Sequence, residues 1–119
     1  MKIGTPKEVF EGEARVAVTP DSARQLQKLG HECFVERGAG ERAGFLDTAY
    51  EEAGVTVLDS AAALWDTADI IAKVRPPSDD EAGRLTADKT LISFFYPGSN
   101  EALMDLCKST GASVIAMDM

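Results

Sequence analysis

The sequence is short of the residues on which several protein classes depend. Its 119 residues include 2 cysteines and 1 histidine. Cys33 and Cys107 lie far apart, so a disulfide framework is excluded, and both thiols are expected to be buried and reduced. Without ligand spacing among these three residues, no zinc site or other metal site is expected. His31 follows the helix-ending Gly30 and is assigned no catalytic role.

Positive charge and long apolar runs are also scarce. The chain has 12 Lys and Arg residues against 20 Asp and Glu residues, which gives a net charge of −8. Because a nucleic-acid binder needs a basic face, nucleic acid is excluded as a partner. No apolar run approaches the roughly 20 residues of a membrane helix, and the first eight residues do not form a signal peptide. We therefore expect a cytoplasmic chain without direct membrane insertion.

What the sequence does have is a regular alternation of short apolar runs with helix-like segments. Its length and its hydrophobic share of 45% suit one domain over residues 1–119. Strands separated by helices indicate βαβ units with right-handed crossovers. We expect an α/β fold, a three-layer sandwich with a flavodoxin-like, mostly parallel sheet. Strands are expected at residues 2–4, 15–18, 31–36, 55–58, 70–74, 90–95 and 113–116.

Capping residues predict where the helices begin. Thr19 suits an N-cap, Pro20 suits the first helical position, and Gly30 suits the end of the same helix. Further helices are expected to be capped by Asp47, by Asp59 or Ser60, and by Ser99 or Asn100, and one more is expected to start near Ser78. The strand at 113–116 has no helix after it to cover the sheet, so the sequence is expected to be the front part of a larger protein or a domain whose partner is another chain.

Arg15 is the first candidate for a ligand cleft. It lies at the start of an expected strand, where its guanidinium could clamp a carboxylate with two hydrogen bonds. It could equally pair with Glu11 or Glu13 and hold the loop in place. The spacing of the residues favours the structural role.

Three further candidates follow expected strands, at the edge where parallel sheets bind their ligands. Lys73 and Arg75 alternate at the end of a buried strand, so they are expected to point the same way and to favour an anion. Tyr96 follows the next strand and could stack on a ligand or donate a hydrogen bond to it. For each of these residues a structural role remains open: a salt bridge for the cations, packing against a neighbouring domain for the tyrosine.

The Gly38-Ala39-Gly40 turn is the pattern that most suggests a dinucleotide site. A phosphate-binding loop needs glycines that open a helix with free N–H groups. Here Gly44 comes one residue too late for that pattern, and residues 45–47 separate it from the next helix. Glu36 and Glu41 would also repel a pyrophosphate. A turn between strand and helix is the preferred interpretation, and no residue of the chain is assigned as catalytic or cofactor-binding.

Several segments together resemble one known family. It comprises the alanine dehydrogenases and the NAD-binding alpha subunits of proton-translocating nicotinamide nucleotide transhydrogenases. The similar segments are residues 1–8, 13–20, 29–32, 35–40, 53–55, 68–76 and 116–118. The resemblance implies that the chain is the first of two α/β domains.

Two departures distinguish this chain from the alanine dehydrogenases, and the Tyr96-Pro97 step and the ending at residues 116–119 resemble the transhydrogenase branch. The resemblance implies that alanine dehydrogenases bind a keto-acid carboxylate with the arginine that matches Arg15 and a lysine at position 75, and use a histidine after the fifth strand. This chain has Arg75 in place of the lysine and Tyr96, followed by Pro97, in place of the histidine. A tyrosine replaces an imidazole poorly as an acid or base near neutral pH.

The resemblance implies a function for the longer parent protein. Such a parent transfers hydride between NAD(H) and NADP(H), coupled to proton translocation, as an oxidoreductase and translocase. Its NAD is expected mainly on residues outside this chain, so the chain alone is not expected to be catalytic. The implied partners are the second NAD-binding domain, the NADP-binding and membrane subunits, and a second copy in a homodimer. The implied location is cytoplasmic, peripheral to the inner membrane.

Two alternatives remain open. The chain could be the N-terminal domain of an alanine dehydrogenase or of a saccharopine dehydrogenase-like amino-acid dehydrogenase. It could also be a non-enzymatic α/β module that holds a small acid with Arg15, Lys73 and Arg75.

Overall fold

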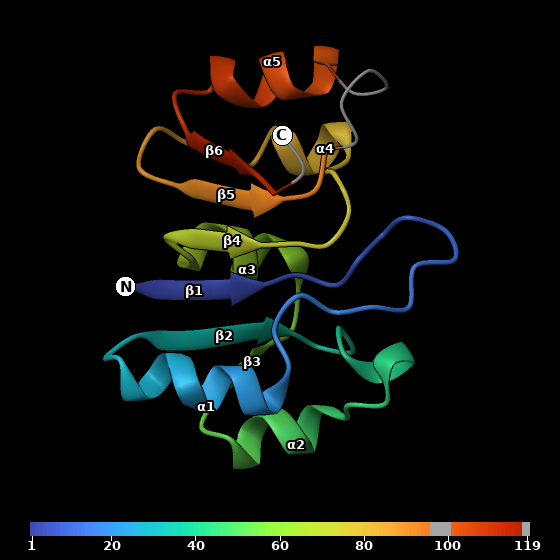
Figure 1. Cartoon of the computed structure of the whole chain (residues 1–119), viewed down its shortest axis with the longest axis vertical. Coiled ribbons are helices and arrows are strands. Elements are labelled where there is room, and N and C mark those ends of the chain that lie inside the picture. Colours follow the sequence, from blue (N-terminus) through green and yellow to red (C-terminus); the bar gives the residue numbers. More distant parts are fainter. Residues whose placement is uncertain (96–100, 118–119) are drawn as a thin grey trace.

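A single parallel sheet organises the molecule. The computed structural model describes residues 1–95 and 101–117. The strands are β1 (Lys2–Thr5), β2 (Glu32–Glu36), β3 (Thr56–Leu58), β4 (Ile70–Ala72), β5 (Thr90–Ser93) and β6 (Ser113–Ala116). Their order in the sheet is β3-β2-β1-β4-β5-β6, and every neighbouring pair is parallel (Figure 1).

Helices cover both faces of this sheet. They are α1 (Pro20–Lys28), a 3-10 turn η1 (Glu41–Ala43), α2 (Asp47–Glu52), α3 (Ala61–Thr67), α4 (Asp79–Ala82) and α5 (Glu101–Ser109). The α1 and α2 helices pack on one face, and α3, α4 and α5 pack on the other. The predicted three-layer α/β sandwich with a parallel sheet is confirmed. Its strand order is 3-2-1-4-5-6, whereas the sheet of flavodoxin itself has the order 2-1-3-4-5.

Each face has its own apolar cluster, because strand side chains alternate between the two faces. On β2, Cys33 and Val35 point toward α1 and α2 and pack with Tyr50. On the opposite face, Ile71 and Leu91 of the central strands pack with residues of α3, α4 and α5. Large side chains buried in this way contribute about 1.5–3 kcal/mol each.

The predicted helix starts are largely confirmed. Thr19 caps α1 in a reciprocal capping box with Ser22, and Pro20 occupies the first turn. Ser60 caps α3, and Ser78 caps α4 in a second capping box with Glu81. The expected caps of α5, Ser99 and Asn100, lie outside the described residues.

The prediction of a strand at residues 15–18 is wrong. These residues form an irregular segment of the long connection between β1 and α1. Both sides of β1 are already paired, with β2 and with β4, so the sheet has no free position beside it. Val18 is instead buried among α1, α2 and β2, where its carbonyl accepts a 2.8 Å hydrogen bond from the Tyr50 hydroxyl.

Two smaller expectations also need correction. The strand expected over 70–74 ends at Ala72, because Glu8 takes the backbone N–H groups of residues 74 and 75 away from the ladder. Leu46, not Asp47, is the N-cap of α2. The Asp47 carboxylate instead accepts a hydrogen bond from the backbone N–H of Gly38 at 2.9 Å.

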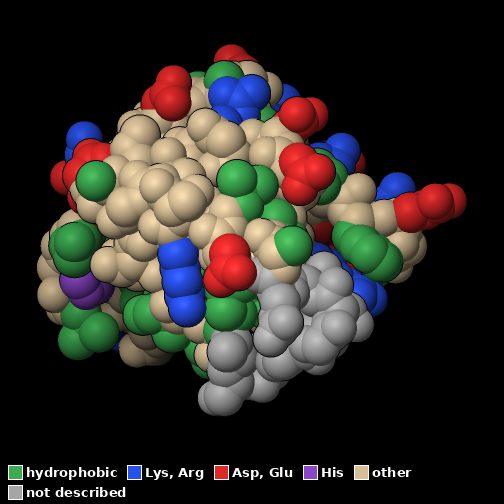
Figure 2. Space-filling view, turned by 90° about the horizontal axis from the view of Figure 1, so that it is seen from above, with side chains coloured by type: hydrophobic (Ala, Val, Ile, Leu, Met, Phe, Trp, Pro, Cys, Tyr) green, Lys and Arg blue, Asp and Glu red, His purple; other side chains and the backbone are tan. Residues whose placement is uncertain are grey.

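The face of the molecule in Figure 2 carries its charges in a mixed pattern. In Figure 2 the Asp and Glu side chains are scattered over the visible face with Lys and Arg between them, and they do not form one acidic patch.

Among the helices that the structure describes, none combines the length and apolar character needed to cross a bilayer. The longest two, α1 and α5, have nine residues each.

Candidate functional site

The order of the strands marks one place where a ligand crevice is expected. The chain runs outward from β1 through β2 to β3, then returns to the other side of β1 to form β4. In a doubly wound sheet, the loops after two such strands diverge and leave a crevice at their carboxyl ends. Here those loops are residues 6–19 after β1 and residues 73–78 after β4.

Glu8 closes this crevice from within. Its carboxylate accepts a hydrogen bond from Lys73 Nζ at 3.0 Å and from the backbone N–H groups of Val74 at 3.0 Å and Arg75 at 3.1 Å. The side chains of Glu8 and Lys73 are only 2% and 1% exposed. Glu81 of α4 lies 3.5 Å from the same ammonium. The loop after β1 is thereby fastened across the crevice to the end of β4.

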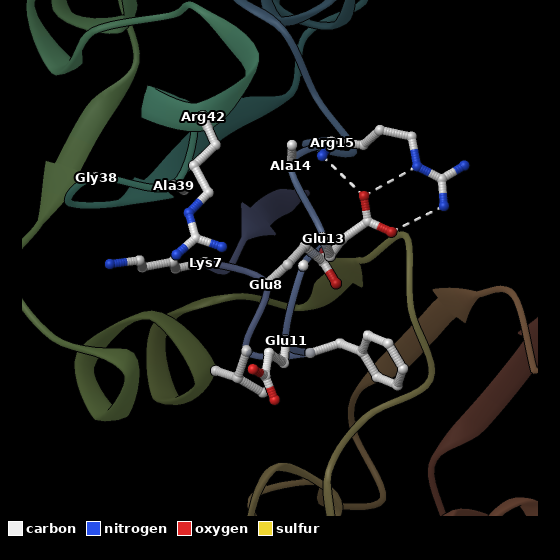
Figure 3. Close-up of a pocket in the computed structure, with 12 residues that line it drawn as sticks. Lys7, Glu8, Glu11, Glu13, Ala14, Arg15, Gly38, Ala39 and Arg42 are labelled. Atoms are coloured by element: carbon white, nitrogen blue, oxygen red, sulfur yellow. Dashed lines mark hydrogen bonds and ion pairs between the residues drawn. The ribbon is translucent and has the colours of Figure 1, made fainter.

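Glu13 forms a second fastening farther along the loop. Arg15 donates to its two carboxylate oxygens from Nε at 3.0 Å and Nη2 at 2.8 Å (Figure 3). The Arg15 backbone N–H adds a bond of 2.8 Å, and Arg75 Nε donates another of 2.8 Å. The hydrogen bonds from the Arg15 side chain, with that of Arg75, hold the pKa of the Glu13 carboxyl far below its usual range, although burial opposes this.

The two arginines on Glu13 differ in exposure. Their side chains are 59% exposed for Arg15 and 29% for Arg75, whereas Glu13 is 4% exposed. The Arg75 guanidinium also stacks over the Phe10 ring, 4.3 Å from its centroid, as a cation–π contact. Val9 and Phe10 form an exposed apolar tip on the loop, beside a groove of about 570 Å³ that Pro76 and Pro77 line.

The start of the same loop is tied to β2. Glu36, the last residue of β2, accepts a 3.0 Å hydrogen bond from the backbone N–H of Lys7. Burial raises the pKa of the Glu36 carboxyl, and this hydrogen bond partly opposes the shift. The loop between β1 and α1 is therefore held by three glutamates: Glu36 at its start, Glu8 within the crevice and Glu13 at its outer end.

The structure divides the three described cleft candidates between two buried carboxylates. It brings Arg15 and Arg75 together on Glu13, which was one of the two partners expected for Arg15. It places Lys73 elsewhere, between Glu8 and Glu81. Tyr96 lies outside the described residues.

Sequence reasoning missed Glu8. A signal was available, because residues 5–8 follow one strand and residues 73–75 follow another at the same edge. Two neighbouring parallel strands would place the carboxylate of Glu8 near Lys73. That inference required the strand order, which the sequence pattern alone does not specify.

The Gly38-Ala39-Gly40 turn has a packing role. A Cβ on Gly40 would lie 2.7 Å from a ring carbon of Tyr50 and 2.8 Å from the carbonyl oxygen of Phe45, so only glycine fits. Gly38 has a φ of +79°, which glycine adopts readily. The backbone N–H of Gly38 donates a hydrogen bond to the Asp47 carboxylate, and the N–H of Ala39 donates one to the Glu36 carbonyl. The turn is thus held by contacts within the chain.

The thiols are placed as expected. Cys33 and Cys107 are free and buried, and burial raises the pKa of both, to about 11 for Cys107. A thiol of this kind is protonated and inert near neutral pH. Over the described part of the chain, no three His, Cys, Asp or Glu side chains gather as metal ligands would.

Comparison with known proteins connects this arrangement to a family. The family described as alanine dehydrogenase/PNT, N-terminal domain, matches residues 4–119. The chain is 65% identical over 119 residues to an NAD(P) transhydrogenase subunit alpha of Cereibacter sphaeroides, covering 100% of this chain and 23% of that protein. It is 42% identical over 118 residues to an alanine dehydrogenase of Halomonas elongata, covering 99% of this chain and 32% of that protein.

Solved structures agree with these sequence matches. A transhydrogenase from Sinorhizobium meliloti superposes with a TM-score of 0.92 at 34% identity, over 99% of this chain and 35% of that one. An L-alanine dehydrogenase gives 0.91 at 34% identity, over 98% of this chain and 32% of that one. This chain thus spans 23% to 35% of the length of these relatives. It belongs to the alanine dehydrogenase/PNT N-terminal domain family.

Proposed function

We propose that this chain is the N-terminal domain of the NAD(H)-binding alpha subunit of an NAD(P) transhydrogenase. The full protein would transfer hydride between NAD(H) and NADP(H), coupled to proton translocation. The observation that carries this proposal is the 65% identity, over the whole chain, to a transhydrogenase subunit alpha. The alanine dehydrogenase of Halomonas elongata is 42% identical over nearly the same length.

The geometry of the crevice supports a domain that does not itself grip a dinucleotide. The carboxylate of Glu8 occupies the space between the loops after β1 and β4. A pyrophosphate placed there would meet the negative charges of Glu8 and Glu13 at short range, in a buried setting where repulsion is strong. The main NAD site is therefore proposed to lie on the second domain of the same subunit.

The contribution of this domain would be a rigid wall. Three glutamates fasten the loop after β1 to β2 and β4, so the edge of the sheet presents a fixed surface. A fixed wall across from a bound cofactor excludes water and limits the positions that the nicotinamide ring can take. The proposed partners are that second domain, the NADP-binding and membrane subunits, and a second copy of the subunit. Such a subunit would lie at the cytoplasmic side of the inner membrane.

The test uses the full-length protein that carries these residues, together with its NADP-binding subunit. We expect hydride transfer from NADH to an NADP⁺ analogue with a distinct absorbance, and no NADH oxidation with pyruvate and ammonium. Oxidation of NADH only in the presence of pyruvate and ammonium would overturn the proposal and identify an alanine dehydrogenase.

A calorimetric titration of the 119-residue chain separates the same two functions without the partner subunits. The chain should show no micromolar binding of pyruvate or NADH. Micromolar binding of pyruvate would count against the transhydrogenase proposal, since it would mean that Arg15 and Arg75 accept a keto-acid carboxylate despite Glu13. Tight NADH binding would contradict the placement of the cofactor site outside these residues.

A further inference from the structure

A second hollow lies beside the closed crevice, between the loop after β1 and the turn after β2 (Figure 3). It has a volume of about 500 Å³, and its lining includes Lys7, Gly38 and Arg42. Lys7 follows β1 and Arg42 belongs to η1, so the two cations come from the carboxyl ends of neighbouring strands. In Figure 3 both side chains lie on one side of the hollow, across from Arg15.

Most carboxylates of the lining are already engaged elsewhere. Glu8 is buried against Lys73, and Glu13 is held by two guanidinium groups. Glu11 also lines the hollow, and it is exposed. The negative charge that this hollow offers to a ligand is therefore smaller than its residue composition suggests.

The two cations are placed differently from those of the crevice. Lys7 and Arg42 are both exposed, and within residues 1–95 and 101–117 neither forms an ion pair. Glu36 accepts a hydrogen bond from the backbone N–H of Lys7, and its charge interacts with the Lys7 ammonium at a distance without forming an ion pair. One exposed carboxylate, that of Glu41, is near: it lies 3.8 Å from the position that a Cβ on Gly38 would take, and the Lys7 Nζ lies 3.9 Å from the same position.

We propose that this hollow binds a phosphate-type oxyanion between Lys7 and Arg42. Two cations on one wall match the charge of a dianion. The guanidinium of Arg42 can donate two parallel hydrogen bonds to its oxygens, and Lys7 supplies a point charge. In a chain with a net charge of −8, two neighbouring cations without ion-pair partners among the described residues are held most favourably with an anion between them. The inference does not rest on the transhydrogenase proposal.

The experiment is a titration of the isotope-labelled 119-residue chain with inorganic phosphate, in a phosphate-free buffer of low ionic strength, followed by amide NMR. We expect saturable shifts at the amides of Lys7, Gly38 and Arg42, with a dissociation constant on the order of 1 mM. Lys7→Gln and Arg42→Gln should each weaken binding about tenfold, which is the effect of losing one charge-assisted hydrogen bond.

A matched control removes a cation elsewhere. Lys28→Gln, in the last turn of α1, lowers the net charge by the same amount and should leave the phosphate affinity unchanged. Equal weakening in Lys28→Gln and Lys7→Gln would overturn the site, because the effect would then be one of overall charge. Absence of saturable shifts at the three amides would overturn it directly.

Two further ligands identify the source of the oxyanion. AMP should produce the same shifts as phosphate, and adenosine should produce none. Tighter binding of AMP than of phosphate assigns the site to a nucleotide phosphate, and equal binding assigns it to free phosphate. Shifts of equal size with acetate would contradict the proposal, since a monoanion would then serve as well as a dianion.

Discussion

Glu8 and Glu13 lie five residues apart on one loop, and both bind cations from residues 73–75, yet their surroundings differ. Glu8 and its partner Lys73 are both almost fully buried. Glu13 is buried too, but Arg15 and Arg75 reach the surface from it. Water can replace a lost carboxylate for the exposed arginines, whereas it cannot reach Lys73 without opening the sheet edge. The same residue type therefore seals the crevice at one position and orients surface guanidinium groups at the other.

This difference divides the edge of the sheet into a closed part and an open part. Between β1 and β4 the chain satisfies its own charges, so the crevice predicted by the strand order holds internal ion pairs. Beside it, between β1 and β2, Lys7 and Arg42 face a hollow. An anionic ligand binds more favourably in the open part, because no ion pair of the protein has to be broken before Lys7 and Arg42 can contact the ligand.

The largest expected effect is that of removing the buried carboxylate. Glu8→Ala leaves Lys73 buried with only Glu81 at 3.5 Å and removes the acceptor of two backbone N–H groups. We expect the free energy of unfolding to fall by about 3–5 kcal/mol, as measured by urea denaturation. Glu11→Ala, an exposed acid on the same loop, is the control and should change it by less than about 0.5 kcal/mol. Equal effects from the two variants would mean that the Glu8–Lys73 pair does not close the crevice.

The outer carboxylate should matter less. Glu13→Gln keeps the shape of the side chain but removes the charge that holds Arg15 and Arg75, and we expect a loss of about 1–2 kcal/mol at pH 7. Because the pKa of Glu13 is lower in the folded than in the unfolded chain, its contribution is complete above its ordinary value of 4.5 and is lost as the pH falls below it. The difference between wild type and variant should therefore shrink as the pH is lowered from about 5 to 2.5.

The comparison of wild type with Glu13→Gln needs urea curves at each pH, with Glu11→Gln as the charge-matched control. A constant difference across this range would show that the ion pairs of Glu13 do not contribute through its charge.

The sequence predicted the helix and strand layers of this fold better than it predicted the long connection between β1 and α1. Alternating apolar runs such as residues 31–36 and caps such as Thr19, Ser60 and Ser78 are local signals, so the elements they mark were found. Residues 15–18 also look like a strand locally. Whether they pair depends on the neighbours of β1, which are set by the order of all six strands and not by any single segment.

The candidate site shows the same limit. Glu13 was one of the two partners predicted for Arg15, because both Glu11 and Glu13 lie within a few residues of it in the chain. The contact between Arg75 and Glu13 spans 62 residues, and that between Lys73 and Glu8 spans 65. Such pairs become visible only when β1 and β4 are known to be neighbours. The glycines at 38 and 40 were interpreted as a turn on their spacing, and the approach of Tyr50 to Gly40 gives the physical reason.

The smallest expected effect concerns Glu36 of β2, the third glutamate that holds the loop, and has the opposite sign to that of Glu13. Burial raises the pKa of Glu36 in the folded chain, so charging this carboxyl costs stability as the pH rises through the interval above 4.5. Glu36→Gln keeps an oxygen that accepts the Lys7 N–H and cannot become charged. The variant should be at least as stable as wild type at pH 7, and the two should converge as the pH falls to about 4. Urea midpoints at the two pH values decide the point, since a variant that is less stable at pH 7 would mean that the charge of Glu36, and not only its hydrogen bond, holds the start of the loop.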